Sequence, residues 1–337
     1  MSTRQVTRTT AFRFGRRGRG RGASLVLSIL ALLSAGVAAQ TTVIAHRGAS
    51  GYLPEHTLAA YAYAHALGVD FVEPDLVMTR DGVLVARHEP MLDETTDVAD
   101  RFPERRAADG HFYAADFDWE ELQTLRTTAY RPGRFPADAR LFGVPRFEEV
   151  IALVEGLDAA RGCRTGLYPE LKDVAWHEAR GLDPVAALRS TLAARPFDGP
   201  LRIQSFEVEP LQALAREPIE GAQLVQLVAR AELVTPQGLE AVAGYADALG
   251  PALMHLEAAR EAGDDIVARA HALGLLVDTW TLRADAHAPF PTFDAAVAAA
   301  LAHGVDGMFT DHPDQLQAAL ERIEGPREAG TAEGCGR

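Results

Sequence analysis

Short apolar runs rich in valine, isoleucine and leucine alternate with longer alanine- and leucine-rich stretches from residue 43 to residue 323. The short runs have the length of buried strands, and the longer stretches place apolar residues at helical spacing. The pattern predicts strands at 43–46, 71–75, 166–170, 201–205, 223–228, 246–250, 275–279 and 307–310. It predicts helices at 57–67, 147–160, 184–194, 208–216, 237–245, 257–273, 293–303 and 313–323.

A series of strands that are each followed by a helix predicts an α/β fold, a closed (β/α)8 TIM barrel. An open, doubly wound sheet is the alternative. The first strand is not followed by Gly-x-Gly-x-x-Gly, the phosphate-binding turn of many such sheets, and this disfavours the alternative. We assign the barrel to residues 40–325 and a tail to residues 326–337.

One long stretch interrupts the alternation after the second predicted strand. The turn Arg80-Asp81-Gly82 lies between two β-rich runs, 76–79 and 83–88, and Asp-Gly between such runs indicates a hairpin. We interpret residues 76–146 as an insertion in the second strand-to-helix loop, at the face where barrel enzymes build their active sites. The hairpin would return His88 to the neighbourhood of the second strand's end.

Residues 1–39 have the three-part layout of a secretory signal peptide. A basic segment precedes an apolar run at 24–35, and Val37-Ala38-Ala39 provides the small residues of a cleavage site. The run is shorter than the ~20 apolar residues that a membrane-spanning helix needs. We therefore expect an exported protein, periplasmic or secreted, without a stable membrane anchor. The pair Arg16-Arg17 leaves the twin-arginine route open beside general secretion.

Export permits disulfides, and Cys163 and Cys335 are the only two cysteines. They lie far apart in the sequence, and Cys335 belongs to a glycine-rich tail. We interpret them as two separate thiols, with a bridge as the alternative.

Charge narrows the classes of partner. The formal net charge is −14, but residues 1–39 hold seven arginines and no acid, which leaves 26 basic residues against 47 acidic ones, a net charge of −21. Because phosphate backbones and anionic lipids repel a protein with this negative charge, nucleic acid and anionic lipid surfaces are disfavoured as partners. Of the 33 basic residues only Lys172 is a lysine.

Candidate chemistry gathers where predicted strands end. Glu73 and Asp75 are two residues apart on one strand and therefore point to the same face, and Glu170 ends the next barrel strand. Crowded carboxylates repel one another unless a proton or a metal lies between them, and oxygen ligands suit Ca²⁺ or Mg²⁺. Solvated acids on an acidic protein are the alternative.

Two further strand ends carry basic groups. His46 and Arg47 close the first strand, where an imidazole can exchange protons and a guanidinium can bind phosphate or carboxylate. Lys172 lies two residues after Glu170, and its ammonium is a compact charge that can approach a single oxyanion. The alternatives are that His46 only caps the strand, that Arg47 lies on the surface, and that Lys172 is placed there by chance.

These motifs resemble those of the glycerophosphodiester phosphodiesterases, in particular the bacterial periplasmic branch. The resemblance rests first on the segment His46–Thr57, which reads HRGASGYLPEHT. The other matching motifs follow in the family's order: Glu73-x-Asp75, Leu76–Thr79, the Asp-Gly hairpin, His88, Thr96–Pro103, Tyr168–Lys172, Gln204-x-Phe206 and Phe309–Asp311. Together they cover about residues 42–320.

The resemblance implies a TIM barrel with a small insertion and the hydrolysis of deacylated phospholipids, such as glycerophosphocholine, to sn-glycerol 3-phosphate and an alcohol. It implies one divalent cation, Ca²⁺ first and Mg²⁺ as the alternative. By position, the metal ligands are Glu73, Asp75 and Glu170, and the acid/base pair is His46 and His88. Arg47 and Lys172 would contact the phosphate, and Glu55 would support the site or bind the glycerol end.

Two positions depart from the family's pattern. Glu89 follows His88 where the family usually has aspartate, which bears on how that histidine is oriented, and His56 replaces the asparagine of the wider family. A phospholipase of similar architecture and an exported binding protein are the alternative functions. The charged insertion argues against the first, and the histidine pair argues against the second. The residues leave the headgroup, the acid and base roles and the oligomeric state open.

Overall fold

The computed structural model describes residues 40–129, 131, 133–136 and 139–325. The predicted signal peptide at 1–39 and the predicted tail at 326–337 lie outside these residues. The strands are β1 (Thr42–His46), β2 (Phe71–Glu73), β3 (Asp75–Met78), β4 (Leu84–Ala86), β5 (Gly166–Leu167), β6 (Glu170–Leu171), β7 (Leu201–Ser205), β8 (Ala222–Val228), β9 (Ala248–Pro251), β10 (Leu276–Leu282) and β11 (Gly307–Thr310).

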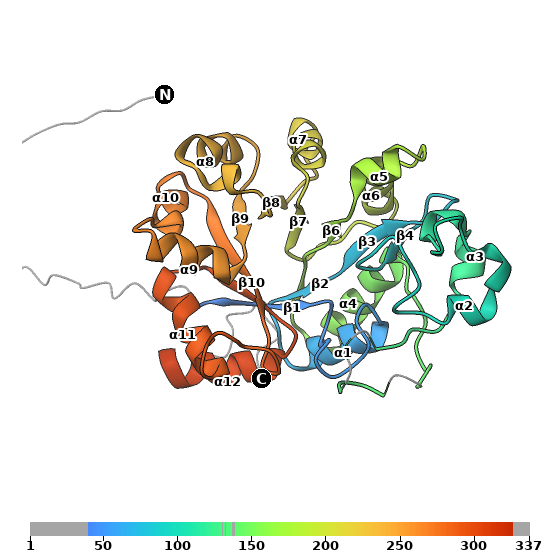
Figure 1. Ribbon diagram of the computed structural model, residues 1–337, viewed down its shortest axis with the longest axis horizontal. Coiled ribbons are helices and arrows are strands. Elements are labelled where there is room, and N and C mark those ends of the chain that lie inside the picture. Colours follow the sequence, from blue (N-terminus) through green and yellow to red (C-terminus); the bar gives the residue numbers. More distant parts are fainter. Residues whose placement is uncertain (1–39, 130, 132, 137–138, 326–337) are drawn as a thin grey trace, which may run out of the picture. The chain divides into compact units, whose positions relative to one another are not determined.

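A closed parallel barrel forms the centre of the protein (Figure 1). Pro74 divides one barrel strand into β2 and β3, and Pro169 divides the next into β5 and β6. Counting each divided strand once, the described residues form eight parallel strands that pair from β1 around to β11, and β11 pairs with β1 to close the ring. The predicted (β/α)8 fold is confirmed.

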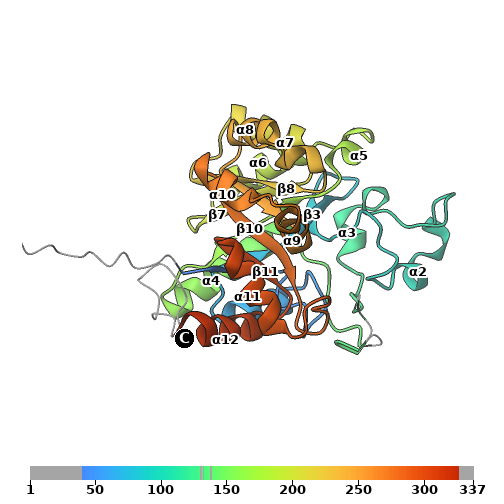
Figure 2. The same cartoon turned by 60° about the vertical axis from the view of Figure 1, so that its left-hand side comes forward.

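Helices surround the barrel and cover its outer face (Figures 1 and 2). They are α1 (Leu58–Ala66), α4 (Phe147–Arg161), α5 (Val174–Glu178), α6 (Pro184–Ala194), α7 (Val208–Arg216), α8 (Pro236–Ala243), α9 (Leu253–Glu261), α10 (Ile266–Ala272), α11 (Phe293–His303) and α12 (Pro313–Glu324). Their apolar faces form one continuous core with the outward-facing strand residues. A smaller cluster that includes Ile44, Tyr168 and Phe309 packs separately from it.

The prediction of a single helix at 257–273 is wrong, because two helices, α9 and α10, occupy that region. The helix α9 ends at Glu261, and Gly263 follows with a φ of +79°, a conformation that glycine adopts without strain. Asp265 then caps α10, since its side chain accepts the backbone N–H of Ala268. The Gly-Asp-Asp sequence between the helices contains both of these signals.

The segment between β3 and α4 forms the predicted hairpin and a small core of its own. In the hairpin, β3 pairs with β4 in antiparallel register, with Val77 opposite Val85. Helices α2 (Val98–Arg101) and α3 (Trp119–Leu122) and short 3₁₀ turns follow, and this part projects from one side of the barrel (Figure 2). Its core contains Phe112, Phe117 and Leu122 and is separate from the barrel's core.

Cys163, just after α4, is disulfide-bonded. The interpretation of two separate thiols is therefore wrong. Cys335 itself lies outside the described residues. Sequence separation, on which that interpretation rested, does not decide which segments a folded chain brings together.

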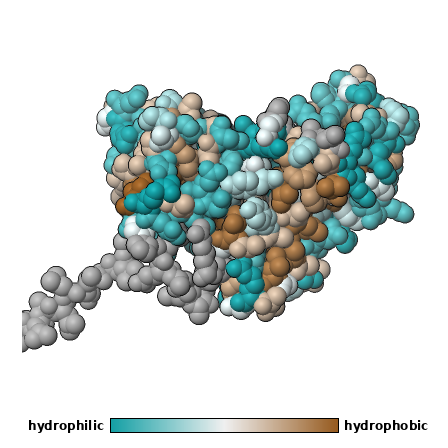
Figure 3. Space-filling view, turned by 90° about the horizontal axis from the view of Figure 1, so that it is seen from below, coloured by the Kyte–Doolittle hydropathy of each residue, from teal (hydrophilic) through white to brown (hydrophobic). Residues whose placement is uncertain are grey.

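The surface is polar over large areas. On the face that Figure 3 shows, hydrophilic residues cover large areas, and hydrophobic residues gather mainly right of the middle, with a smaller group at the left edge. Within the described part of the chain, no helix is both long enough and apolar enough to cross a membrane.

His177 on α5 provides a test of the packing between this helix and β3. The side chain is fully buried, and its Nε2 accepts the backbone N–H of Met78 at 3.4 Å, which requires the neutral ring. Burial, and secondarily the charge of Arg180, lowers the pKa of His177 from 6.5 to about 4. Between these values the unfolded chain binds a proton that the folded chain does not, so stability is lost as the pH falls from about 6.5 to about 4.

We expect His177→Gln to reduce this loss by up to about 1.4 kcal/mol for each pH unit, because glutamine can accept the same N–H without titrating. Urea unfolding at pH 7, 6 and 5 measures the effect. His271→Gln, at an exposed histidine on α10, is the control. Equal pH slopes in His177→Gln and the unmodified protein would contradict the prediction.

Candidate active site

Two prolines interrupt neighbouring barrel strands at the same level. The register that pairs Asp75 with Glu170 also places Pro74 opposite Pro169. Proline has no backbone N–H, so each interrupts the regular ladder there. Glu73 precedes this interruption, and Asp75 and Glu170 directly follow it. The backbone therefore brings three acidic residues to one place at the carboxyl end of the barrel.

The three carboxylates form one buried cluster. One oxygen from each of Glu73, Asp75 and Glu170 lies within 4.8 Å of the others, and all three side chains are buried. Burial, with the charges of Asp75 and Glu170, raises the pKa of Glu73 well above its usual range. Burial also raises the pKa of Glu170 to about 8, against the opposing charge of Lys172. Negative charge on these carboxyls is therefore unfavourable unless a proton or a cation lies between them.

Asp75 is the carboxylate in the cluster with the most cationic surroundings. Burial alone would raise its pKa, but Lys172, a hydrogen bond from His56 and the charge of Arg47 outweigh burial and hold the pKa well below its usual range. His56 Nε2 lies 2.9 Å from Asp75 Oδ2, and His56 Nδ1 lies 2.8 Å from the hydroxyl of Tyr61. The residue that departs from the wider family's asparagine thus fixes one carboxylate of the cluster.

This donor set fits a hard divalent cation. Its ligand atoms are carboxylate oxygens, which Ca²⁺ and Mg²⁺ prefer. Gln204 on β7 donates from Nε2 to Glu73 Oε1 at 3.1 Å, while its buried Oε1 has no hydrogen-bond partner among the described residues. A buried acceptor without a donor is costly in free energy unless something positive or a hydrogen-bond donor is nearby.

His46 ends β1 and is held by a carboxylate from the far end of the chain. Its Nδ1 lies 2.7 Å from Asp311 Oδ1, and Asp311 follows β11 directly. Burial, and secondarily the charge of Arg47, lowers the pKa of His46 to about 4, so the imidazole is neutral near pH 7. Nε2 of His46 has no partner among the described residues. Asp311 thus orients the ring and leaves one nitrogen available.

Asp311 is itself fixed by two arginines. Arg283, from the loop after β10, and Arg134, from the insertion, each donate to Asp311 Oδ2 at 2.8 Å. Arg134 also forms two hydrogen bonds with Asp285, at 2.8 and 2.9 Å. The insertion therefore contacts the group that positions His46, and a planar guanidinium makes that contact with defined geometry.

His88 reaches the site through the hairpin, as the sequence predicted. Its Nδ1 lies 2.6 Å from Glu89 Oε1, and about a third of its side chain is exposed. Glu89, longer than the family's usual aspartate, still contacts the imidazole. Both histidines thus have Nδ1 against a carboxylate, an arrangement that orients the ring and keeps Nε2 clear of that carboxylate.

Arg47 and Lys172 supply positive charge at opposite sides of the cluster. Arg47 has a φ of +58°, and its backbone N–H donates to Glu73 Oε2 at 2.7 Å while Glu55 holds its guanidinium. Lys172 Nζ lies 3.0 Å from Glu170 Oε1. A non-glycine residue in the left-handed region is strained, and such strain is retained where surrounding contacts fix it.

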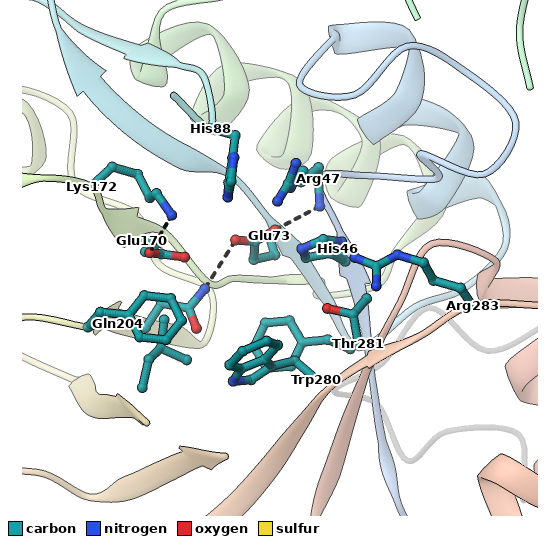
Figure 4. A pocket seen from close by; sticks show the side chains of 13 residues that line it. His46, Arg47, Glu73, His88, Glu170, Lys172, Gln204, Trp280, Thr281 and Arg283 are labelled. Carbon is teal, nitrogen blue, oxygen red and sulfur yellow. Dashed lines mark hydrogen bonds and ion pairs between the residues drawn. The ribbon is translucent and has the colours of Figure 1, made fainter. Parts of the chain in front are cut away.

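One cavity of about 120 Å³ brings most of these groups together (Figure 4). Figure 4 shows their side chains converging from different strands around Glu73. Six predicted site residues line the cavity: His46, Arg47, Glu73, His88, Glu170 and Lys172. Phe206, Trp280 and Phe309 provide an apolar part of its wall.

Two predicted residues lie outside that lining. Asp75 is buried behind it, where His56 and Arg47 contact it. Glu55 lines a neighbouring cavity, and its two carboxylate oxygens each lie 3.1 Å from Arg47 Nη1. Through these contacts Glu55 positions the guanidinium of Arg47.

The sequence alone predicts no role for Arg283 or Arg134, and Gln204 and Asp311 stand out only as members of motifs. The position of Asp311 in the sequence does indicate a site residue, since it follows the last barrel strand at the face where site residues gather. Nothing in the sequence around Arg134 indicates such a role, because its position depends on how the insertion folds back over the barrel.

Comparison with known proteins agrees with this geometry. Residues 46–315 match the model of the glycerophosphoryl diester phosphodiesterase family. A glycerophosphodiester phosphodiesterase from Haemophilus influenzae is 33% identical over 81% of this chain and 87% of its own length. One from Treponema pallidum is 32% identical over 66% of this chain and 73% of its own length.

A solved structure shares the fold. The phosphodiesterase from Oleispira antarctica, determined in complex with the product sn-glycerol-3-phosphate, superposes with a TM-score of 0.65 at 23% identity, over 84% of this chain and 97% of its own. The family match and the relatives together show that this chain belongs to the glycerophosphoryl diester phosphodiesterase family and is a phosphoric diester hydrolase.

Proposed function

We propose that the protein hydrolyses glycerophosphodiesters such as glycerophosphocholine to sn-glycerol 3-phosphate and an alcohol, with a divalent cation and a histidine acid/base pair. The observation that carries the proposal is the convergence of two carboxylate-oriented histidines, two cationic side chains and two carboxylates of the buried cluster, Glu73 and Glu170, on one small cavity. We also propose that the protein is exported, with residues 1–39 as its signal peptide.

Glu73, Asp75 and Glu170 would hold the cation, with Ca²⁺ as the first candidate and Mg²⁺ as the second. A cation bound there neutralises charge on the phosphate and polarises its oxygens. Arg47 and Lys172 flank the same cavity and stabilise the negative charge that grows on the non-bridging oxygens in the transition state. Because both side chains already have acidic partners that fix their positions, little reorganisation is needed when the substrate enters.

His46 acts as the base and His88 as the acid in this proposal. Nε2 of His46 takes the proton of the attacking hydroxyl, whose oxygen forms a new bond to phosphorus. The bond from phosphorus to the headgroup oxygen breaks, and His88 gives that oxygen its proton. We assign the acid to His88 because it lines both the cavity of about 120 Å³, called the reaction cavity from here on, and the neighbouring cavity that Glu55 lines.

The attacking hydroxyl belongs either to the substrate's glycerol or to water. The first route gives a cyclic phosphate that water then opens, and the second gives glycerol 3-phosphate directly. Both routes use the same two histidines. In the first, opening of the cyclic phosphate exchanges their roles, because His88 takes a proton from water and His46 returns its proton to the glycerol oxygen; in the second, proton exchange with solvent restores both histidines.

The proposal is tested by incubating the protein with glycerophosphocholine and measuring glycerol 3-phosphate. We expect product in the presence of Ca²⁺ or Mg²⁺, no product after chelation, and recovery when the cation is restored. Circular dichroism of the chelated protein shows whether the fold persists. Absence of product with either cation would refute the proposed activity, and full activity in chelator would refute the cation.

A further inference from the structure

We infer that the cavity beside the reaction site is a headgroup subsite that selects an ammonium-bearing alcohol, such as ethanolamine or choline. This inference rests on the proposed function and names its substrate class. Four observations carry it: the cavity's size, its shared walls with the reaction cavity, the charges on its outer wall and an unpaired arginine in its inner wall.

The cavity measures about 600 Å³ and lies between the barrel's mouth and the insertion. Arg47 and His88 line both this cavity and the reaction cavity. The smaller cavity suits the compact glycerol and phosphate groups. A phosphodiester bound between Arg47 and His88 therefore extends its second alcohol into the larger cavity, and His88 is placed at the oxygen that leaves with that alcohol.

The outer wall of this cavity carries excess negative charge. Glu89, Asp93 and Glu94 line it, against one arginine on the same wall, Arg106. Arg106 is already engaged, since its Nη1 donates to the carbonyl of Gly110 at 2.6 Å and its guanidinium lies over the ring of Phe112. An ammonium group entering the cavity would meet more negative than positive charge.

Glu94 is the best placed of these acids to act on a ligand. Glu89 contacts His88, and Asp93 accepts the backbone N–H of Phe112 and lies 3.4 Å from His111. The carboxylate of Glu94 is exposed and has no partner among the described residues. Its charge is therefore available to a headgroup, and it is separate from the reacting groups.

The inner wall of the cavity presents unpaired donors instead. Arg87 lines this wall and is 1% exposed, yet its Nε and Nη1 have no acceptor among the described residues. A buried guanidinium without acceptors favours a ligand that brings oxygen atoms to that end. The cavity thus pairs donors near the phosphate end with carboxylates farther out, which matches the charge order of a phosphate ester of an amino alcohol.

The test compares kcat/KM for glycerophosphoethanolamine with kcat/KM for glycerophosphoglycerol, whose headgroup is an uncharged polyol. We expect the unmodified protein to prefer the ammonium substrate. Glu94→Gln should lower kcat/KM for that substrate by about two- to fivefold, as expected for an exposed charge pair, and leave the polyol substrate unchanged. Glu94→Lys should lower it further.

Glu120→Gln removes the same charge from an exposed position of the insertion that does not line the cavity, and it should leave the ratio of the two kcat/KM values unchanged. Activity on the polyol substrate shows that each variant is folded. An unchanged ratio in both Glu94 variants would overturn the headgroup inference while the hydrolase activity stands. Absence of turnover on every glycerophosphodiester would instead refute the proposed function.

Discussion

Replacing His46 or His88 with alanine is expected to lower kcat by about 10²–10⁴-fold in each case, because in the proposed mechanism each histidine supplies one of the two proton transfers. The two Nδ1 atoms are held by Asp311 and Glu89, so the paired imidazoles are already oriented before substrate binds. Steady-state assays of glycerol 3-phosphate release at saturating substrate measure the effect.

The double variant distinguishes a concerted pair from two independent groups. If the histidines act in one step, removing both should cost little more than removing either, since effects within one catalytic unit are not additive. His271→Ala, at an exposed histidine on the outer helices, should keep full activity. Near-normal turnover in either single variant would show that the corresponding histidine is not part of the acid/base pair.

Replacing Glu73 with glutamine should lower activity by about 10³-fold and remove stabilisation by Ca²⁺. A cation's charge at the phosphate is worth several kcal/mol in the transition state, and Glu73 is one of the three clustered carboxylates that would hold it. Thermal unfolding with and without Ca²⁺ provides a readout that is independent of turnover. In the unmodified protein, Ca²⁺ at about 100 times its Kd should contribute about 2.7 kcal/mol of stability.

The same substitution should not destabilise the cation-free protein. Burial and the neighbouring carboxylates raise the pKa of Glu73 well above its usual range, so the neutral amide of glutamine replaces a carboxyl whose charged form is already disfavoured. Glu55→Gln is the matched control: it makes the same chemical change at a residue that contacts Arg47 and lies outside the carboxylate cluster, so Ca²⁺ should still stabilise it. Equal stabilisation of Glu73→Gln by Ca²⁺ would remove Glu73 from the ligand set.

Most residues of the candidate site could be predicted from the sequence because all barrel strands end at one face. Glu73, Asp75, Glu170 and His46 each stand at or next to a strand terminus, so assigning the strands was enough to gather them. The Asp-Gly turn at residues 81–82 similarly set the hairpin that returns His88. These features depend on periodicity and turn chemistry, which are properties of short segments.

What the sequence left open depends on contacts between distant segments. Arg134 reaches Asp311 across 177 positions, and nothing in its own surroundings indicates that partner. Arg87 follows a strand and would ordinarily be assigned to the surface, yet it is 1% exposed. The break between α9 and α10 is a different case, because its glycine and its capping aspartate were both visible in the sequence.

The single lysine makes the reaction cavity addressable by chemical labelling. Apart from the α-amino group, Lys172 is the only amine in the chain, and its Nζ lies beside Glu170 on the wall of that cavity. The charges of Glu170 and Asp75 outweigh burial and raise the pKa of Lys172, and its side chain is 11% exposed, so labelling requires alkaline pH. Reductive methylation with ¹³C-formaldehyde would then introduce one side-chain resonance, without mutagenesis or isotope-labelled growth. Its chemical shift would report on cation and substrate at the cavity, and the extent of labelling would report on how far bound substrate shields the amine.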